Sequence, residues 1–189
     1  GTTVLDRILS DHSRGTSMGE SLYFAQQLKR AAGSRTALLL DQQVEETLDD
    51  ERLLHEVGRL FGERCEAQVG AGVRPLDKFH LNFMLAGHIM RARPDARLLC
   101  LVRDPLDTIA SNFRQLFEFE TPLYHYALEQ CAAARMQLAF LKLAQTWARL
   151  APDQFRIIAY EALVTDPEPQ ARALFAFCGL PWEEGCTRI

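Results

Sequence analysis

The first segment of the chain has the residue types of a small anion-binding site. Gly1-Thr2-Thr3 stands at the start of a predicted helix, where backbone N–H groups, two hydroxyls and the helix dipole could face a negative charge. An alternative is that Thr2 and Thr3 are ordinary helix-capping residues. Taken alone, this segment does not identify a ligand.

A second segment of this kind runs from Arg103 to Ser111. Arg103 ends an apolar stretch that is predicted to be a central strand, and open α/β sheets bind ligands at the carboxyl ends of such strands. Asp107 and Ser111 are four positions apart, so they share one face of the helix that follows. A guanidinium and a hydroxyl that converge in this way suit a phosphate group. The alternative is a surface ion pair between Arg103 and a nearby aspartate, beside an ordinary helical serine.

A layered scaffold would be needed to bring these segments together. Residues 97–102 and 155–160 are largely apolar runs, and a shorter strand is predicted from about residue 73 to 77. Short apolar strands separated by long helical stretches indicate a buried parallel sheet. The alternating order of strands and helices predicts an α/β fold.

The predicted helices have clearer boundaries than the strands. One runs from Pro105 to about Phe117, with Asp104 as its N-cap and proline at its first position. The chain also begins in an apparent helix. Three further helical stretches are predicted at residues 44–66, at residues 123–150, and between Asp166-Pro167 and the stop signal Gly179-Leu180-Pro181.

Composition and charge narrow the class of protein. The 189 residues suit a single domain, and 48% hydrophobic and 24% charged residues are typical of a soluble globular protein. A net charge of -4 argues against a general nucleic-acid binder but allows a small anionic ligand. The sequence contains no apolar run of the roughly 18 residues that a membrane span needs.

The cysteines indicate a reducing environment. There are five, an odd number without CxxC spacing, which predicts neither a disulfide framework nor a zinc site. Reduced thiols and a cytoplasmic location are expected. Cys100 lies within an apolar run and is expected in the core, because free cysteine is among the most buried residue types.

Four segments, in order, resemble the PAPS-dependent sulfotransferases, especially the bacterial relatives of the tyrosylprotein sulfotransferases (PAPS is 3'-phosphoadenosine 5'-phosphosulfate). Gly1-Thr2-Thr3 is similar to the end of the family's PRSGTT loop. The other three are residues 77–83, similar to a DKxPxNF motif, residues 103–111, similar to RDPxDxxxS, and residues 160–167 with 177–182, similar to the ending YExLVxDPE...FxGLPW. The resemblance runs from Gly1 to about Cys186.

The resemblance implies both a fold and an activity. The fold would be a three-layer α/β/α arrangement with a central parallel sheet, of the P-loop nucleotide-binding type. Residues 1–189 would form a single catalytic domain, truncated at both ends. The activity would be sulfuryl transfer from PAPS to an acceptor hydroxyl or amine by in-line displacement, with PAP as the product and no metal. The acceptor would be a small molecule or a peptide; its identity and the oligomeric state are not predicted.

The resemblance also assigns roles in donor binding. The 5'-phosphosulfate would be held by the start of the first helix, and the 3'-phosphate by a guanidinium and a hydroxyl further along the chain. The residues concerned are Gly1, Thr2 and Thr3 for the 5'-phosphosulfate, Arg103 and Ser111 for the 3'-phosphate, and Tyr160 near the adenine or its phosphate.

Two residues would carry the chemistry. Lys78 would neutralise charge on the leaving phosphate, and Glu20, in Met18-Gly19-Glu20-Ser21, would be the general base that takes the acceptor's proton. The alternatives are a solvated lysine at position 78 and a carboxylate at position 20 that is favoured by a helix start.

Several features depart from the family pattern or leave other functions open. His80 stands where the family usually has proline, and the loop arginine and serine that should precede Gly1 are absent from this sequence. His12 could transfer a proton or could simply follow a helix end. A P-loop kinase would need a Gly-Lys-Ser/Thr triplet, which the sequence lacks. An inactive sulfotransferase-like scaffold is the other alternative.

An aromatic stretch is the candidate for the acceptor cleft. Between residues 113 and 126 the sequence contains Phe117, Phe119, Tyr124 and Tyr126. These rings could line a cleft or could be ordinary packing.

Overall fold

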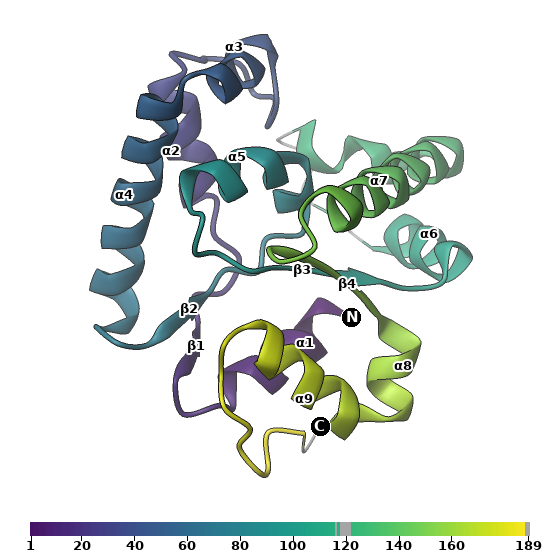
Figure 1. Ribbon diagram of the computed structural model, residues 1–189. Coiled ribbons are helices and arrows are strands. Elements are labelled where there is room, and N and C mark those ends of the chain that lie inside the picture. The colour runs from purple at the N-terminus through teal and green to yellow at the C-terminus, as the bar shows by residue number, and fades with distance from the viewer. Residues whose placement is uncertain (116, 118–121, 188–189) are drawn as a thin grey trace.

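The computed structural model describes residues 1–115, 117 and 122–187, which form a mixed α/β domain (Figure 1). Its strands are short and lie between longer helices. They are β1 (Gly15–Ser17), β2 (Arg74–Leu76), β3 (Leu98–Val102) and β4 (Phe155–Ala159). The predicted strands at 73–77, 97–102 and 155–160 are therefore confirmed, whereas β1 was not predicted.

Helices make up most of the remaining described chain. The α-helices are α1 (Thr2–Ser10), α2 (Tyr23–Ala31), α3 (Gln42–Glu46), α4 (Glu51–Val69), α5 (Ala86–Ala92), α6 (Pro105–Arg114), α7 (Gln130–Leu150), α8 (Tyr160–Thr165) and α9 (Pro167–Phe177). Three 3₁₀ helices connect them: η1 (Thr47–Asp49), η2 (His80–Leu85) and η3 (Pro122–Leu128).

All strand pairing in the described residues is parallel. β1 pairs with β2, from Gly15 opposite Arg74 to Ser17 opposite Leu76. β3 pairs with β4 over five residues, from Leu98 opposite Phe155 onward. The two pairs are separate two-stranded sheets, so the α/β class is confirmed while one continuous central sheet stays a prediction.

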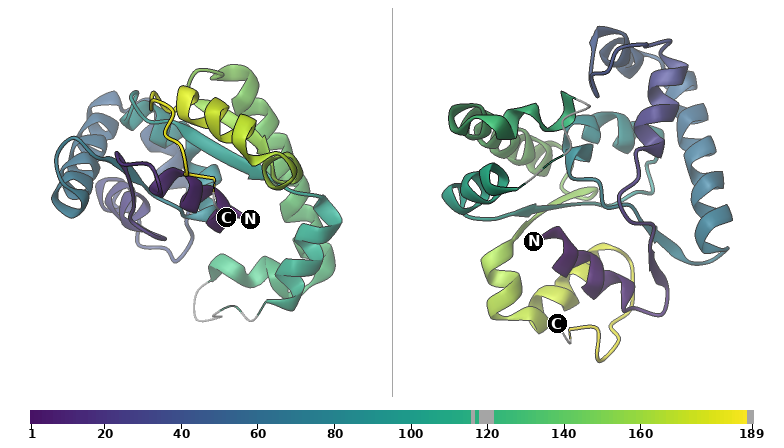
Figure 2. Two further views of the ribbon diagram at one scale, coloured as in Figure 1. Left: turned by 90° about the horizontal axis from the view of Figure 1, so that it is seen from below. Right: turned by 180° about the vertical axis from the view of Figure 1, so that it is seen from behind.

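Helices cover both faces of the β3–β4 pair (Figures 1 and 2). Cys100 and Phe155 pack with α5 and α7 on one side, whereas Ile158 packs with α1 and α9 on the other. Leu99 and Leu101 also face the α1 and α9 side, as the two-residue period of a strand requires. Burial on both faces explains why these strands read as continuous apolar runs.

Capping residues set the helix boundaries. Asp104 caps α6 as predicted: its carboxylate accepts hydrogen bonds from the Leu106 N–H at 2.9 Å and the Asp107 N–H at 3.1 Å. The stretch predicted to be helical at 44–66 is helical but divided, because the Asp50 carboxylate caps a new helix, α4, through the Leu53 N–H at 3.0 Å. Local cap chemistry there overrides the apolar periodicity.

The long helix predicted from residue 123 also begins later than expected. Residues 122–128 form the 3₁₀ helix η3, and α7 begins at Gln130. Aromatic residues favour helices weakly, and here Tyr124 stacks instead on the His80 ring, with centroids 5.4 Å apart. None of the described helices combines the length and the apolarity needed to cross a membrane.

Candidate functional site

Residues that follow three of the strands line a single cavity of about 600 Å³. Glu20 lies in the loop after β1, Lys78 lies two residues beyond β2, and Arg103 directly follows β3. The start of α1 and Ser111 on α6 complete this wall. The carboxyl ends of parallel strands are the expected place for a ligand site in an α/β fold.

Six of the eight predicted site residues line this cavity: Gly1, Thr2, Glu20, Lys78, Arg103 and Ser111. Thr3 is exposed and is not among the lining residues. Tyr160 is also outside the lining, but it lies against two residues that belong to it. Its ring lies 5.3 Å from the Arg103 guanidinium, and a Cβ atom on Gly1 would come within 3.1 Å of the same ring.

The start of α1 is open to an anion. Gly1 is the N-cap residue, and in the described chain no side chain caps this helix, so the capping alternative for Thr2 and Thr3 is not supported. The first N–H groups of a helix lack partners within the helix and can bind a ligand. Arg103 and Lys78 line the same cavity as this helix start.

Arg103 forms the ion pair that its alternative interpretation predicted. Its guanidinium donates to the Asp107 carboxylate at 2.8 Å, four residues along. The two side chains are 39% and 59% exposed. Exposed pairs at this spacing contribute only about 0.3–0.5 kcal/mol, so a phosphate could replace Asp107 at little cost. The ion pair is therefore compatible with a phosphate site.

Lys78 is not freely solvated. Its ammonium nitrogen lies 3.9 Å from Asp6 Oδ2, and the two side chains are only 22% and 16% exposed. The other oxygen of Asp6, Oδ1, is buried and has no hydrogen-bond partner among the residues that the structure describes. Asp6 lines the cavity but was not predicted. The signal was its position four residues after Thr2, which places both on one face of α1.

Glu20 is exposed at the cavity and lies outside the helix that follows it. Because α2 begins at Tyr23 with Leu22 as its N-cap residue, the alternative of a helix-start carboxylate does not fit. The His80 side chain is exposed at the rim, yet the surrounding protein still desolvates it and lowers its pKa, an effect that the nearby Glu20 carboxylate opposes.

Asp77 is a second acidic residue that the sequence did not single out. It precedes Lys78, lines the cavity, and accepts a hydrogen bond from the Ser21 N–H at 3.4 Å. Burial raises its pKa to about 6, while hydrogen bonds from Ser21 and the Asn82 side chain oppose that shift. A carboxyl group in a cavity with such a shift is a candidate functional group.

Part of the predicted aromatic stretch lines the same cavity. Phe117 and Tyr126 are lining residues, and the Phe117 and Tyr124 rings stack with centroids 4.6 Å apart. Phe119 lies outside the described residues. An acceptor role for this stretch stays a prediction.

His12 has a structural environment. It is 1% exposed, directly follows the C-cap of α1 and does not line the cavity, which supports the helix-end interpretation. Its Nδ1 accepts from the Arg14 N–H at 3.0 Å, so Nε2 carries the proton and donates to the Pro181 carbonyl at 2.9 Å. Glu183 Oε1 lies 3.6 Å from Nε2.

The cysteines form no disulfide in the described chain. All five thiols are free, and Cys100 is buried as predicted. Within residues 1–115, 117 and 122–187, no group of three or more His, Cys, Asp or Glu side chains is arranged to hold a metal ion.

Comparison with known proteins adds two findings. The sequence model of the family described as "Sulfotransferase family" matches residues 1–184. An uncharacterized protein of Aquifex aeolicus (strain VF5) is 29% identical over 187 residues, which cover 97% of this chain and 25% of that protein. The chain thus spans about a quarter of the length of this relative.

Proposed function

Because this chain belongs to the sulfotransferase family, we propose that it transfers a sulfuryl group from PAPS to an acceptor hydroxyl or amine. One observation carries the proposal. A single cavity gathers an open helix start at Gly1 and Thr2, the cations of Lys78 and Arg103, and the Glu20 carboxylate. These groups suit an anionic donor beside a proton acceptor.

The residues around the cavity fit a nucleotide with phosphates at two positions. Arg103 and Ser111 would bind the 3'-phosphate, with Tyr160 beside the guanidinium. The start of α1, with Thr2 and Thr3, would hold the 5'-phosphosulfate. Asp6 is the exception, because its carboxylate beside Lys78 would repel an anion.

The proposed mechanism needs only two side chains to act directly. The donor, when bound, supplies a sulfuryl group that is activated by its link to a phosphate. Glu20 would take the acceptor's proton as the acceptor oxygen or nitrogen bonds to sulfur and the bond from sulfur to the bridging oxygen breaks. Lys78 would place its ammonium beside that bridging oxygen, which keeps the electron pair. No metal enters this proposal.

We extend the proposal to the domain organisation and to the acceptor. Residues 1–189 would form one catalytic domain. The acceptor would be a small molecule or a peptide. Acceptor specificity resides in surface loops, so the fold does not identify the acceptor.

Calorimetric titration with PAP, 5'-AMP and ATP at one salt concentration tests the proposal. We expect PAP to bind at least tenfold more tightly than the other two, a difference of about 1.4 kcal/mol. Tighter binding of ATP would favour a kinase instead. PAP binding without sulfuryl transfer to any of a panel of hydroxyl and amine acceptors would favour an inactive scaffold.

A further inference from the structure

The loop that carries Glu20 is tied to the end of β2 at three points. The Met18 N–H donates to the Leu76 carbonyl at 2.9 Å, and the Lys78 N–H donates to the Gly19 carbonyl at 3.0 Å. Both of these links join backbone to backbone. The third joins the Ser21 N–H to Asp77 Oδ1 at 3.4 Å and depends on a side chain. Glu20 lies between the second link and the third.

This third link fixes the far side of the loop. The Ser21 hydroxyl in turn accepts from the Tyr23 N–H at 3.1 Å, where α2 begins. The Asp77 carboxylate therefore joins the end of β2 to the entry of α2, and Glu20 is the residue held between them. A base has to stand within hydrogen-bond reach of the proton that it takes, so freedom in this loop would lower the rate.

We propose that Asp77 is a positioning residue, whose carboxylate holds the Ser21 end of the loop and thereby orients Glu20 toward the acceptor. The inference rests on the proposed function and deepens it. Asp77 acts through Glu20 and does not itself contact the reacting atoms.

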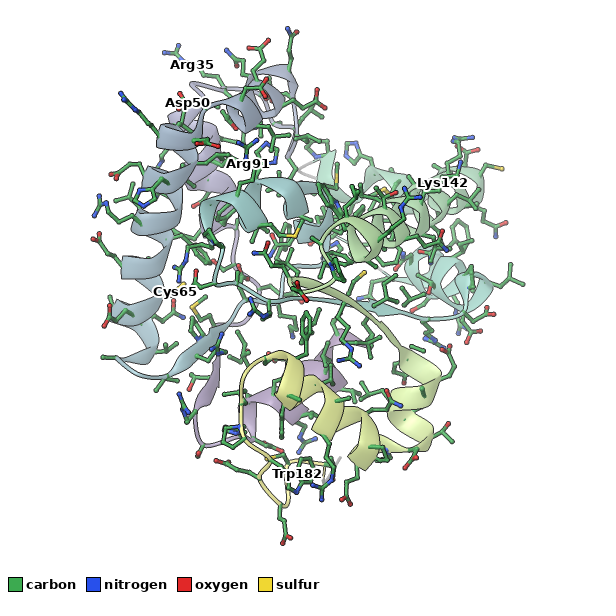
Figure 3. All side chains as sticks on the ribbon, viewed as in Figure 1. Arg35, Asp50, Cys65, Arg91, Lys142 and Trp182 are labelled. Carbon is green, nitrogen blue, oxygen red and sulfur yellow. The ribbon has the colours of Figure 1, made fainter. Side chains whose placement is uncertain are left out.

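The groups that face Asp77 come from three elements. Ser21 belongs to the loop and Asn82 to η2, and both donate hydrogen bonds to it. Cys65 belongs to α4 (Figure 3); burial, with a smaller effect of the Asp77 charge, raises the pKa of that thiol to about 11, so the thiol is neutral near pH 7. Lys78, the next residue in the chain, is paired with Asp6, and Arg93, which also acts on the Cys65 thiol, is paired with Asp95.

The burial of Asp77 makes the link sensitive to pH. Its pKa is raised to about 6, so the carboxylate becomes protonated as the pH falls through 6, and its hydrogen bond from Ser21 weakens. Protonation of Asp77 has the opposite effect on the free energy of unfolding, because it stabilises the folded protein. A carboxyl group whose pKa is raised by folding destabilises the folded protein as it ionises, between its ordinary pKa of 3.8 and about 6. The ionised group thus costs stability, which a purely structural residue would not be expected to do.

Steady-state kinetics of sulfuryl transfer, from pH 5 to 9, test the inference. Asp77→Ala should lower kcat by about ten- to a hundredfold, with the dissociation constant of PAP within about twofold of wild type because no phosphate contact is lost. Asp77→Asn keeps a neutral acceptor oxygen for the Ser21 N–H, as the protonated acid does, so its kcat at pH 7.5 should equal the lowered value that the wild type reaches below pH 6. This variant should also remove the acid limb near pH 6. The matched control is Asp11→Ala, which removes an exposed carboxylate outside the cavity and should leave kcat unchanged.

Thermal unfolding separates positioning from folding. Asp77→Asn should be at least as stable as wild type at pH 7.5, because it removes a buried charge. If Asp77→Ala does not fold, Asp77→Asn alone decides: an acid limb near pH 6 that persists in this variant overturns the inference. Wild-type kcat in a folded Asp77→Ala also overturns it, with the proposed function intact. Wild-type protein that transfers no sulfuryl group overturns the proposed function and this inference together.

Discussion

On the β3–β4 side of the cavity the charged groups stand in solvent, whereas on the β1–β2 side the charged groups around the exposed Glu20 are largely removed from it. The first side is made by Arg103, Ser111 and Tyr160, and its ion pair with Asp107 is 39% and 59% exposed. The second is made by Glu20, Asp77 and Lys78, together with Asp6 of α1. There the Lys78–Asp6 pair is 22% and 16% exposed, and the pKa of Asp77 is raised to about 6.

This difference separates two tasks. Exposed cations can exchange one anion for another at little cost, which suits reversible binding of a nucleotide product. Desolvated charges interact more strongly and hold their geometry, which suits a group that must act on the reacting atoms. Substitutions of Glu20 and Asp77 should therefore change kcat, and substitution of Arg103 should change affinity.

The largest effect is expected from Glu20→Gln. The amide has nearly the shape of the carboxylate but cannot accept the acceptor's proton, so kcat should fall by about 10²–10⁴-fold. Measurement of kcat alongside calorimetric binding of PAP checks this, because PAP affinity should stay at the wild-type value. A kcat within threefold of wild type would remove Glu20 as the base.

Arg103→Ala should act on affinity instead. Loss of one charge-assisted phosphate contact costs about 1.5–3 kcal/mol, so the dissociation constant of PAP should rise by about ten- to a hundredfold. The affinity for 5'-AMP, which lacks the 3'-phosphate, should change little. Asp107→Asn is the matched variant, since it removes the partner of Arg103 while keeping the guanidinium, and its PAP affinity should be equal to or slightly above wild type. Equal loss of PAP and 5'-AMP affinity in Arg103→Ala would contradict a 3'-phosphate site.

The smallest effect is expected from Asp6→Asn, which removes the carboxylate beside Lys78. Because that carboxylate would repel an anionic ligand, the variant should bind PAP about three- to tenfold more tightly. Calorimetry at two salt concentrations measures this. Weaker PAP binding would mean that Asp6 serves mainly to hold Lys78 in place, and would assign it to the same group of positioning residues as Asp77.

Several features could be predicted from the sequence because they depend on residues close together in the chain. The Asp104-Pro105 pair predicted the start of α6, because an N-cap carboxylate and a first-turn proline act within a few residues of chain. The apolar runs of β3 and β4 were readable because both faces of these strands are buried. Glu20, Lys78, Arg103 and Ser111 were placed through motif resemblance, and the structure brings them to one cavity.

Other features carried no local signal. β1 is three residues long, Gly-Thr-Ser, and is a strand because it pairs with β2 across more than fifty residues of chain. Strand propensity depends strongly on such context. The split of residues 44–66 into separate helices depended on the competition between a cap at Asp50 and the apolar pattern.

The sequence by itself determined the residue types, the start of α6 and the order of β2, β3 and β4 among the helices, since these follow from interactions between near neighbours. Tertiary structure alone decided which charges meet and how far each is desolvated. Pairing of β1 with β2 places the loop that carries Glu20 beside Lys78, whose N–H donates to the Gly19 carbonyl, and the packing of α1 brings Asp6 within 3.9 Å of the same lysine. Burial, which raises the pKa of Asp77, is a property of the assembled fold, because it depends on atoms contributed by segments far apart in the chain.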